Sequence, residues 1–367
     1  MTDLPTEASP EGPATAVELA LLQVLRRAIG DPAIEFDGEP VRLTGGFWAE
    51  LISFRLTGAQ APWDRRLVAR LMPNASLAMR ETVVQAEVAE QGFATPRVHL
   101  SGDADGGLGR AFMVMDHADG APLLAGLAGG SAIVRLPALA RRIPDTLASA
   151  MASLHRVDVA PIRARLAALA TTAHDTDSPY TTLAGAGDGI AAFLVGLEAA
   201  AHALGRADLV GAARWLAAHP PADAPDVVCH GDLHPFNVLM ADDGSFTVLD
   251  WSAANLAPAA HDAAFTSLVL SEPPLYVPRA VRPVVRAVGR MLARRFLRTY
   301  ERESGTALGA ESLRWHQGVV CLRALVEAAH WVVADELDSR QGHPWLVSGA
   351  AFANRLSTLT GQPIRPL

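Results

Sequence analysis

One segment constrains this chain more than any other: a run of apolar residues that leads into His230, Gly231 and Asp232 and is followed by Asn237. The order His-x-Asp-x-x-x-x-Asn is that of a kinase catalytic loop, in which the Asp accepts a hydroxyl proton and the Asn holds a metal ion. The protein-kinase pattern has Arg between the His and the Asp, where this chain has Gly231. The spacing predicts a site for phosphoryl transfer within a folded domain.

A second carboxylate follows this segment at the distance of a hairpin. Asp250 ends the apolar run 246–249, and residues 241–244, Ala-Asp-Asp-Gly, have the composition of a tight turn. A two-stranded ribbon would bring Asn237 and Asp250 together at its open end. An amide oxygen and a carboxylate oxygen are hard ligands of the kind that Mg²⁺ prefers.

Residues 230–239, followed by the Leu-Asp-Trp of 249–251, resemble the aminoglycoside phosphotransferase and choline kinase-like family. The likeness extends over roughly residues 40–335. It implies an α+β, protein-kinase-like two-lobed fold: a small β-rich N-lobe with one helix, and a large, mainly helical C-lobe with a small β insert. It also implies transfer of the γ-phosphate of ATP, or of GTP, to a hydroxyl group of a small molecule.

The resemblance also assigns roles within the motif. Asp232 is the expected catalytic base, and Asn237 and Asp250 are the expected Mg²⁺ ligands. For His230 two roles are open, support of the loop backbone or a part in the chemical step, and support is the favoured one. Phe236 stands where the family often has Gly.

Two features near the N-terminus fit phosphate binding. Thr44, Gly45 and Gly46 lie between strand-like runs and can form a turn whose backbone N–H groups cover phosphates, although a plain hairpin is the alternative. Arg70 occupies the strand position where kinases carry a phosphate-binding Lys. The chain contains no Lys, so all 31 cationic side chains are Arg, and Arg can clamp phosphate with two hydrogen bonds.

The partner of that cation is expected on the helix that follows. Glu81 matches the family's helix glutamate, and Glu87 and Glu90 on the same helix are its rivals. An apolar strand that passes into a polar, Gly-ended turn at 112–120 resembles the hinge between the lobes. Met115 and His117 are therefore expected to contact the adenine ring.

Two further residues have expected supporting roles. Asp262 resembles an Asp that follows the metal-binding loop in the family, and we expect it to be structural and to hold the catalytic loop. His155 matches the end of a family helix, and we expect it to pack or to cap that helix.

Apolar periodicity and turn residues give the organisation of the chain. We expect a loose tail at 1–15, an N-lobe at 16–120 and a C-lobe at 121–367. The expected helices are 17–29, 77–91, 139–154 with a kink or a delay at Pro144, 278–302 and 309–337. The expected strands are 41–44, 50–57, 66–72, 97–100 and 111–116, with a second strand-rich island at 226–250.

Composition narrows the function classes. The net charge of −8 argues against a nucleic-acid-binding protein, and the two cysteines have neither disulfide nor metal-ligand spacing. The most apolar candidate for a membrane span, 189–205, is too short and carries Glu198 and His202. We expect a cytoplasmic protein without membrane contact, and the oligomeric state stays open.

The acceptor is predicted only by class. The resemblance implies that the acceptor lies between the catalytic loop and helices of the C-lobe, within about 160–220 and 265–345. These segments are rich in Ala and Leu and poor in acids, which favours a partly apolar hydroxylated metabolite or antibiotic over a polycationic aminoglycoside. Two alternatives to an active small-molecule kinase remain. One is a nucleotide-binding pseudoenzyme or regulatory module; the other is a protein kinase, which the absence of an Ala-Pro-Glu motif after Asp250 disfavours.

Overall fold

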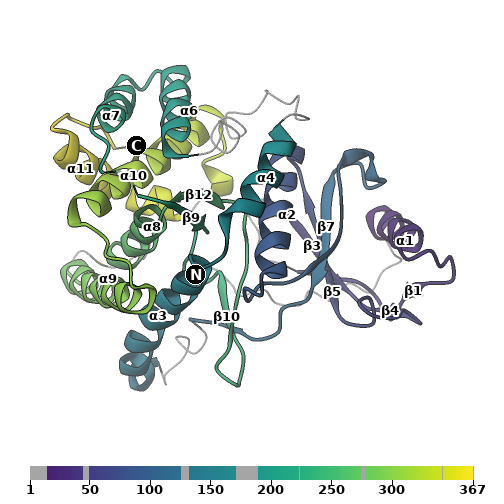
Figure 1. Ribbon diagram of the computed structural model, residues 1–367. Coiled ribbons are helices and arrows are strands. Elements are labelled where there is room, and N and C mark those ends of the chain that lie inside the picture. The colour runs from purple at the N-terminus through teal and green to yellow at the C-terminus, as the bar shows by residue number, and fades with distance from the viewer. Residues whose placement is uncertain are drawn as a thin grey trace. The chain divides into compact units, whose positions relative to one another are not determined.

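The computed structural model describes residues 15–43, 49–124, 132–170, 189–222, 224–273, 278, 280–340 and 342–366. The chain forms two compact units. Unit 1 comprises Met1–Gly120, Ala164–Ala173 and Thr247–Ser252, and unit 2 comprises Ala121–Arg163, His174–Phe246 and Ala253–Leu367. Unit 1 is a small sheet with helices, and unit 2 is mainly helical (Figure 1).

Unit 1 contains an antiparallel five-stranded sheet in the order β2-β3-β5-β7-β6. Its strands are β2 (Val41–Leu43), β3 (Glu50–Phe54), β5 (Leu67–Met72), β6 (Val98–Gly102) and β7 (Ala111–Asp116). A two-stranded ribbon joins β1 (Glu35–Phe36) to β4 (Leu56–Thr57), and η1 (Ala104–Gly106) is a single 3₁₀ turn. These strands fall where the sequence predicts them, apart from the short β1.

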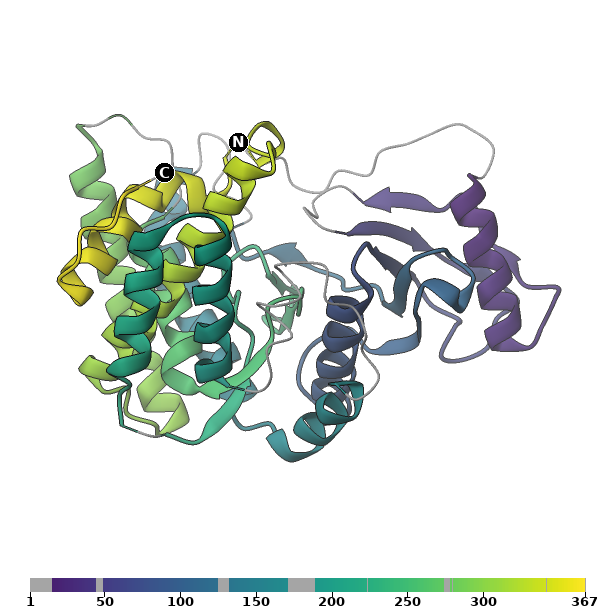
Figure 2. The same cartoon turned by 90° about the horizontal axis from the view of Figure 1, so that it is seen from above.

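Helices α1 and α2 of unit 1 cover opposite faces of this sheet (Figure 2). Helix α1 (Ala16–Ile29) begins with a capping box between Thr15 and Glu18 and packs on the face that carries Leu67 and Leu71. Helix α2 (Ala75–Glu90) packs on the other face. Because side chains alternate along a strand, Arg70 lies on the α2 face.

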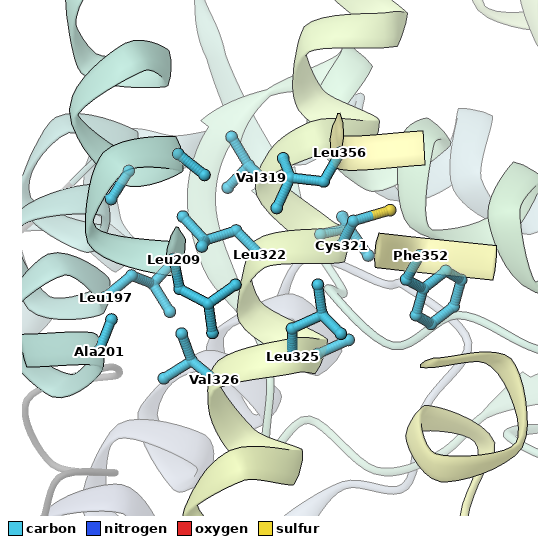
Figure 3. Packing of buried hydrophobic residues seen from close by; sticks show 14 of the residues in the cluster. Leu197, Ala201, Leu209, Val319, Cys321, Leu322, Leu325, Val326, Phe352 and Leu356 are labelled. Atoms are coloured by element: carbon cyan, nitrogen blue, oxygen red, sulfur yellow. The ribbon is translucent and has the colours of Figure 1, made fainter. Parts of the chain in front are cut away.

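Unit 2 is built around a buried central helix, α10 (Ala310–Val333). Leu322 and Leu325 of α10 lie among apolar side chains of the neighbouring helices, as Figure 3 shows. Those neighbours are α6 (Ile190–Ala203), α7 (Ala207–Ala218), α8 (Ala259–Ser271) and α11 (Pro344–Thr360). Trp315, Trp331 and Trp345 are buried here, so three of the tryptophans are core residues.

The remaining helices of unit 2 lie around this core. They are α3 (Ala132–Leu154), α9 (Arg282–Ser304), the 3₁₀ turn η2 (Asp338–Arg340) and α4 (Val159–Ala170), of which the part from Ala164 belongs to unit 1. Helix α3 runs without interruption past Pro144, so the expected delay there is wrong. The turn that follows Pro144 is held by Asp145, which accepts two hydrogen bonds from Arg295 of α9.

Four short strands position the catalytic loop. They are β8 (Ala121–Pro122), β9 (Asp226–Cys229), β10 (Val238–Met240) and β12 (Asn255–Pro258); β11 (Phe246–Val248) follows the predicted turn. Strand β9 pairs antiparallel with β12, and β10 pairs antiparallel with β8. The turn closes as the sequence predicts, because Ala241 N–H donates to the carbonyl of Ser245 at 2.9 Å.

None of the helices within the described residues combines the length and the apolar character needed to cross a bilayer.

Candidate active site

The catalytic loop is held by a buried carboxylate from α8. Asp262 is fully buried and accepts the backbone N–H of Gly231 at 2.9 Å and of His230 at 3.0 Å. Burial acts to raise the pKa of Asp262, but the hydrogen bond and charge of His155, with these backbone contacts, leave that pKa below its usual value. A buried, charged acceptor of two N–H groups fixes the path of the loop.

His155 and Tyr300 complete this support. His155, at the start of the turn after α3, has Nε2 3.2 Å from Asp262 Oδ2 and Nδ1 2.7 Å from the Tyr300 hydroxyl. Burial raises the pKa of Tyr300 to about 12, so the phenol keeps its proton, and its hydroxyl lies within hydrogen-bond distance of the His155 ring. Contacts from Tyr300 of α9 through His155, which follows α3, to Asp262 of α8 therefore link three helices to the backbone of His230 and Gly231.

Gly231 is required by the shape of the loop. Its φ is +74°, a left-handed conformation, and a Cβ built on it would lie 2.2 Å from the carbonyl oxygen of Ala253. No side chain fits there without moving backbone. The departure from the protein-kinase pattern at this position thus has a local steric reason.

Asp232 and Asn237 lie together at the end of this loop. The Asn237 Nδ2 group donates to the Asp232 carbonyl at 2.9 Å and to Asp232 Oδ2 at 3.2 Å. That orientation uses the amide N–H₂ and leaves Oδ1 as the oxygen that can accept or ligate. His234 Nε2 is 3.6 Å from Asp232 Oδ2, and its Nδ1 accepts from the Phe236 N–H.

In unit 1, Arg70 joins two carboxylates. Its Nη2 is 3.1 Å from Asp250 Oδ1 and 3.5 Å from Glu81 Oε2, and its Nε is 3.1 Å from Glu81 Oε1. Glu87 and Glu90 instead approach Arg165, at 2.9 and 3.4 Å. Of the three candidate helix glutamates, Glu81 is therefore the one beside Arg70.

Burial sets the charge balance of this cluster. It raises the pKa of Glu81 to about 7, against the opposing charge of Arg70, and the nearby Asp250 acts in the same direction as burial. Burial lowers the pKa of Arg70, but Asp250 and Glu81 outweigh it, so that pKa is raised and the guanidinium stays charged. One guanidinium thus contacts two carboxylates.

Asp250 has a strained backbone held by its neighbours. Its φ is +64°, which is uncommon for a residue with a side chain. The indole of Trp251 donates to Thr95 Oγ1 at 2.9 Å, and that hydroxyl donates to the carbonyl of Val248 at 2.9 Å. The sequence motif contains Trp251 but gives no sign of Thr95, which lies over 150 residues away in the chain.

The hinge prediction falls on β7 and the turn after it. Gln85 donates its amide to Met115 Sδ at 3.2 Å and to the Pro96 carbonyl at 2.9 Å, which fixes the Met115 side chain on the α2 side of the sheet. The His117 N–H donates to the Arg66 carbonyl at 3.1 Å. The His117 ring approaches Asp119 at 3.1 Å, and burial lowers its pKa.

Thr44, Gly45 and Gly46, the predicted phosphate turn, lie outside the described residues, as does nearly all of the predicted tail. Unit 1 brings Arg70, Glu81 and Asp250 together, and unit 2 brings Asp232 and Asn237 together beside His230.

Comparison with known proteins places this arrangement in a family. The chain matches the model of the phosphotransferase enzyme family over residues 53–316. That span includes Arg70, Glu81 and the whole catalytic loop. A search of curated proteins found no match.

Solved structures share the fold at low identity. A Ralstonia eutropha protein proposed to be an aminoglycoside phosphotransferase is 15% identical, with a TM-score of 0.61, over 94% of this chain and 98% of that one. The macrolide 2′-phosphotransferase of Brachybacterium faecium is 18% identical, with a TM-score of 0.50, over 89% and 97%.

A third structure is a thermostable mutant of an aminoglycoside phosphotransferase in a ternary complex with ADP and hygromycin B. It is 18% identical, with a TM-score of 0.52, over 89% of this chain and 97% of that one. These similarities show the predicted kinase-like fold, with its small sheet-containing lobe and its helical lobe. Together with the family match, they show that this chain belongs to the phosphotransferase enzyme family.

Proposed function

We propose that this protein transfers the γ-phosphate of ATP to a hydroxyl group of a small-molecule acceptor, with Asp232 as the base. The observation that carries the proposal is the link from Asn237 Nδ2 to Asp232 in a loop whose backbone is fixed by Asp262. A carboxylate at a fixed place can orient a hydroxyl and take its proton, which is the main task of protein in phosphoryl transfer. His230 then supports the loop, because its backbone N–H is bound by Asp262.

The donor atoms suit Mg²⁺. We propose Asn237 Oδ1 and a carboxylate oxygen of Asp250 as its protein ligands; both are hard oxygens, and so few protein ligands leave room for water and phosphate. Bound there, Mg²⁺ would neutralise phosphate charge. No soft ligand is needed, and none is part of the proposed set.

Arg70 and Glu81 are proposed to serve the nucleotide. In the described cluster the Arg70 guanidinium contacts Asp250 and Glu81, and its remaining N–H groups can donate to phosphate oxygens. Glu81 keeps the guanidinium in place on the α2 face of the sheet. Thr44, Gly45 and Gly46 stay proposed as the covering turn.

The adenine ring is proposed to lie at the turn after β7, beside Met115. The N–H groups of Asp116 and His117 already donate to the carbonyls of Arg97 and Arg66. Among the described residues the next N–H, that of Ala118, has no backbone partner, so we assign it to the base. The same backbone turn could bind guanine, so GTP is a second possible phosphate donor.

The test is transfer of labelled γ-phosphate from Mg·ATP and Mg·GTP to a panel of hydroxylated metabolites and antibiotics, including partly apolar ones. Wild type, Asp232→Ala and the matched control Asp242→Ala, an exposed residue of the nearby turn, are compared. We expect transfer by wild type and control, and a loss of at least about 100-fold in Asp232→Ala with nucleotide binding retained. Equal nucleotide binding by all three with no transfer to any acceptor would instead favour a binding module.

A further inference from the structure

Helix α9 carries two features on its exposed side that neither the fold nor the proposed site uses. Val284, Val288 and Met291 are 61, 45 and 50% exposed and follow one another at spacings of four and three. Residues at these spacings lie along one stripe of a helix. These three side chains define an apolar row on the exposed side of α9, the helix labelled in Figure 1.

A second row lies beside the first. Arg290, Arg294 and Arg298 are exposed and spaced four residues apart. Among the described residues none of these three has a carboxylate within ion-pair distance, whereas Arg295 on the same helix is paired with Asp145. Like charges four residues apart destabilise a helix, so this arginine row is not explained by helix stability.

The apolar row is not part of the face through which α9 packs against the rest of unit 2. The buried side of α9 consists of other residues, among them Gly289, Ala293 and Phe296. Gly289 lies so close to α8 that an added Cβ would be 2.5 Å from the carbonyl oxygen of Leu270. The helix therefore packs tightly through one face and presents a different, basic and apolar face outward.

Charge selects the occupant of that face. Residues 282–304 contain seven Arg and two Glu, a formal charge of +5, in a chain whose net charge is −8. A helix with exposed apolar side chains along one stripe and arginines beside it is the pattern of a helix that lies in the interface of an anionic bilayer. Although the sequence predicts no membrane contact, we propose that the outer face of α9 docks unit 2 onto an anionic lipid surface.

Other occupants fit less well. A two-fold contact with a second copy would bring the arginine row against its own equivalent, which like-charge repulsion opposes. Nucleic acid would engage the arginines but would leave the apolar row in water. The proposal is independent of the phosphotransfer activity, because none of these six side chains belongs to the candidate active site.

The experiment is sedimentation of the full chain with vesicles of phosphatidylcholine alone, and with vesicles that contain about 30 mol % phosphatidylglycerol. We expect binding only to the anionic vesicles, weakened at high salt because the charges are exposed. The variant Arg290→Gln/Arg294→Gln/Arg298→Gln should bind roughly 100-fold more weakly. The variant Val288→Gln/Met291→Gln should also bind more weakly, at unchanged charge.

The matched control removes three exposed arginines from other elements: Arg27→Gln/Arg97→Gln/Arg314→Gln. It should keep most of the binding, and circular dichroism should show all variants folded. An equal loss in the two triple variants, or equal binding to neutral and anionic vesicles, would overturn the proposal. The proposal would also be overturned if the wild-type protein bound polyglutamate or RNA but no vesicles, and if the α9 arginine variant lost that binding. This result would assign the face to a different anionic partner.

Discussion

At the scale of single residues, the candidate site depends on backbone positions that few side chains can occupy. Gly231 and Asp250 both have positive φ, and they lie at the two ends of the segment that contains the proposed ligands. The Gly231 position is closed by the Ala253 carbonyl, and Asp250 is held by the Trp251 indole that reaches Thr95. Conformations of this kind persist only where surrounding contacts determine them.

Replacing Gly231 by Ala should unfold the loop or the whole of unit 2. The added Cβ meets a backbone oxygen at 2.2 Å, so the expected cost exceeds the ~1–2 kcal/mol of a left-handed alanine alone. Gly244→Ala is the matched control, because Gly244 also has positive φ but nothing within 4 Å of the new Cβ. Denaturant unfolding measures both; equal losses of stability would show that the Ala253 contact costs nothing.

Asp262→Asn tests the support of the loop while keeping the shape of the side chain. The amide has no negative charge to bind the two backbone N–H groups and His155. We therefore expect a loss of roughly 2–4 kcal/mol in the free energy of unfolding. Transfer activity should fall with it. Asp145→Asn breaks a partly exposed pair with Arg295 and should cost less than about 1 kcal/mol. An effect of Asp262→Asn no larger than that would contradict the proposed support.

At the scale of elements, α2 positions Glu81, and its start is set by a single cap. Asn74 Oδ1 accepts the Leu77 N–H at 3.0 Å, and Gly92, with positive φ, follows its end. The helix begins at Ala75, two residues before the predicted Leu77, because the cap precedes the apolar pattern. Glu81 lies two turns from this cap, so the cap contributes to the position of its carboxylate.

Asn74→Ala should lower the free energy of unfolding by about 1 kcal/mol, the usual value of an Asn cap. It should also weaken nucleotide binding slightly, since Glu81 would hold Arg70 less firmly. The control is Asn354→Ala, an exposed residue within α11 that caps no helix. Thermal unfolding measures the stability and nucleotide titration measures the affinity. Equal stability and equal affinity in the two variants would contradict a role for the Asn74 cap.

At the scale of the whole molecule, buried histidines make stability depend on pH. His261 and His316 have ring centroids 5.5 Å apart, and within the described part of the chain three of their ring nitrogens are buried without a hydrogen-bond partner. Burial lowers the pKa of His261 to about 4 and of His316 to about 3; Arg323 adds to the effect at His261, and Asp262 opposes it. Both rings are therefore neutral in the folded protein at neutral pH.

The sign of the effect follows from these pKa values. In the unfolded chain a histidine takes up a proton near pH 6.5, whereas in the folded protein these two do so only near pH 4 and 3. The contribution of these two residues to the free energy of unfolding should thus fall as pH falls below about 6.5, approaching ~1.4 kcal/mol per pH unit for each residue by pH 5. His316→Phe should reduce the slope between pH 6 and about 4.5 by about 1 kcal/mol per pH unit, the contribution of one such histidine, while exposed His202→Phe should not change it. Unfolding curves across this range would contradict the prediction if the His316→Phe slope stays that of wild type.

Much of the fold could be predicted because its signals are local. Apolar periodicity and terminal glycines located α1 and α2 within two residues, and alternating apolar runs located the sheet strands. Helix α11 was not predicted, since its buried residues face a core whose other side comes from α6, α7 and α10. The exposed face of α9 was also missed, because a Val–Arg pattern does not reveal which side of a helix is already packed.

By itself, the sequence determined the chemical groups of the site and their order: a His-Gly-Asp loop with Asn237, a later Asp250, and Arg70 in a chain without Lys. These groups could be identified from the number of residues between them, which can be read directly from the sequence. Only the tertiary structure decided which groups meet. Glu81 rather than Glu87 lies beside Arg70, Asp262 binds the loop from α8, and Thr95 holds Trp251. Such contacts join residues 11 to 156 positions apart, and they depend on burial and on the packing of whole elements, which no local pattern encodes.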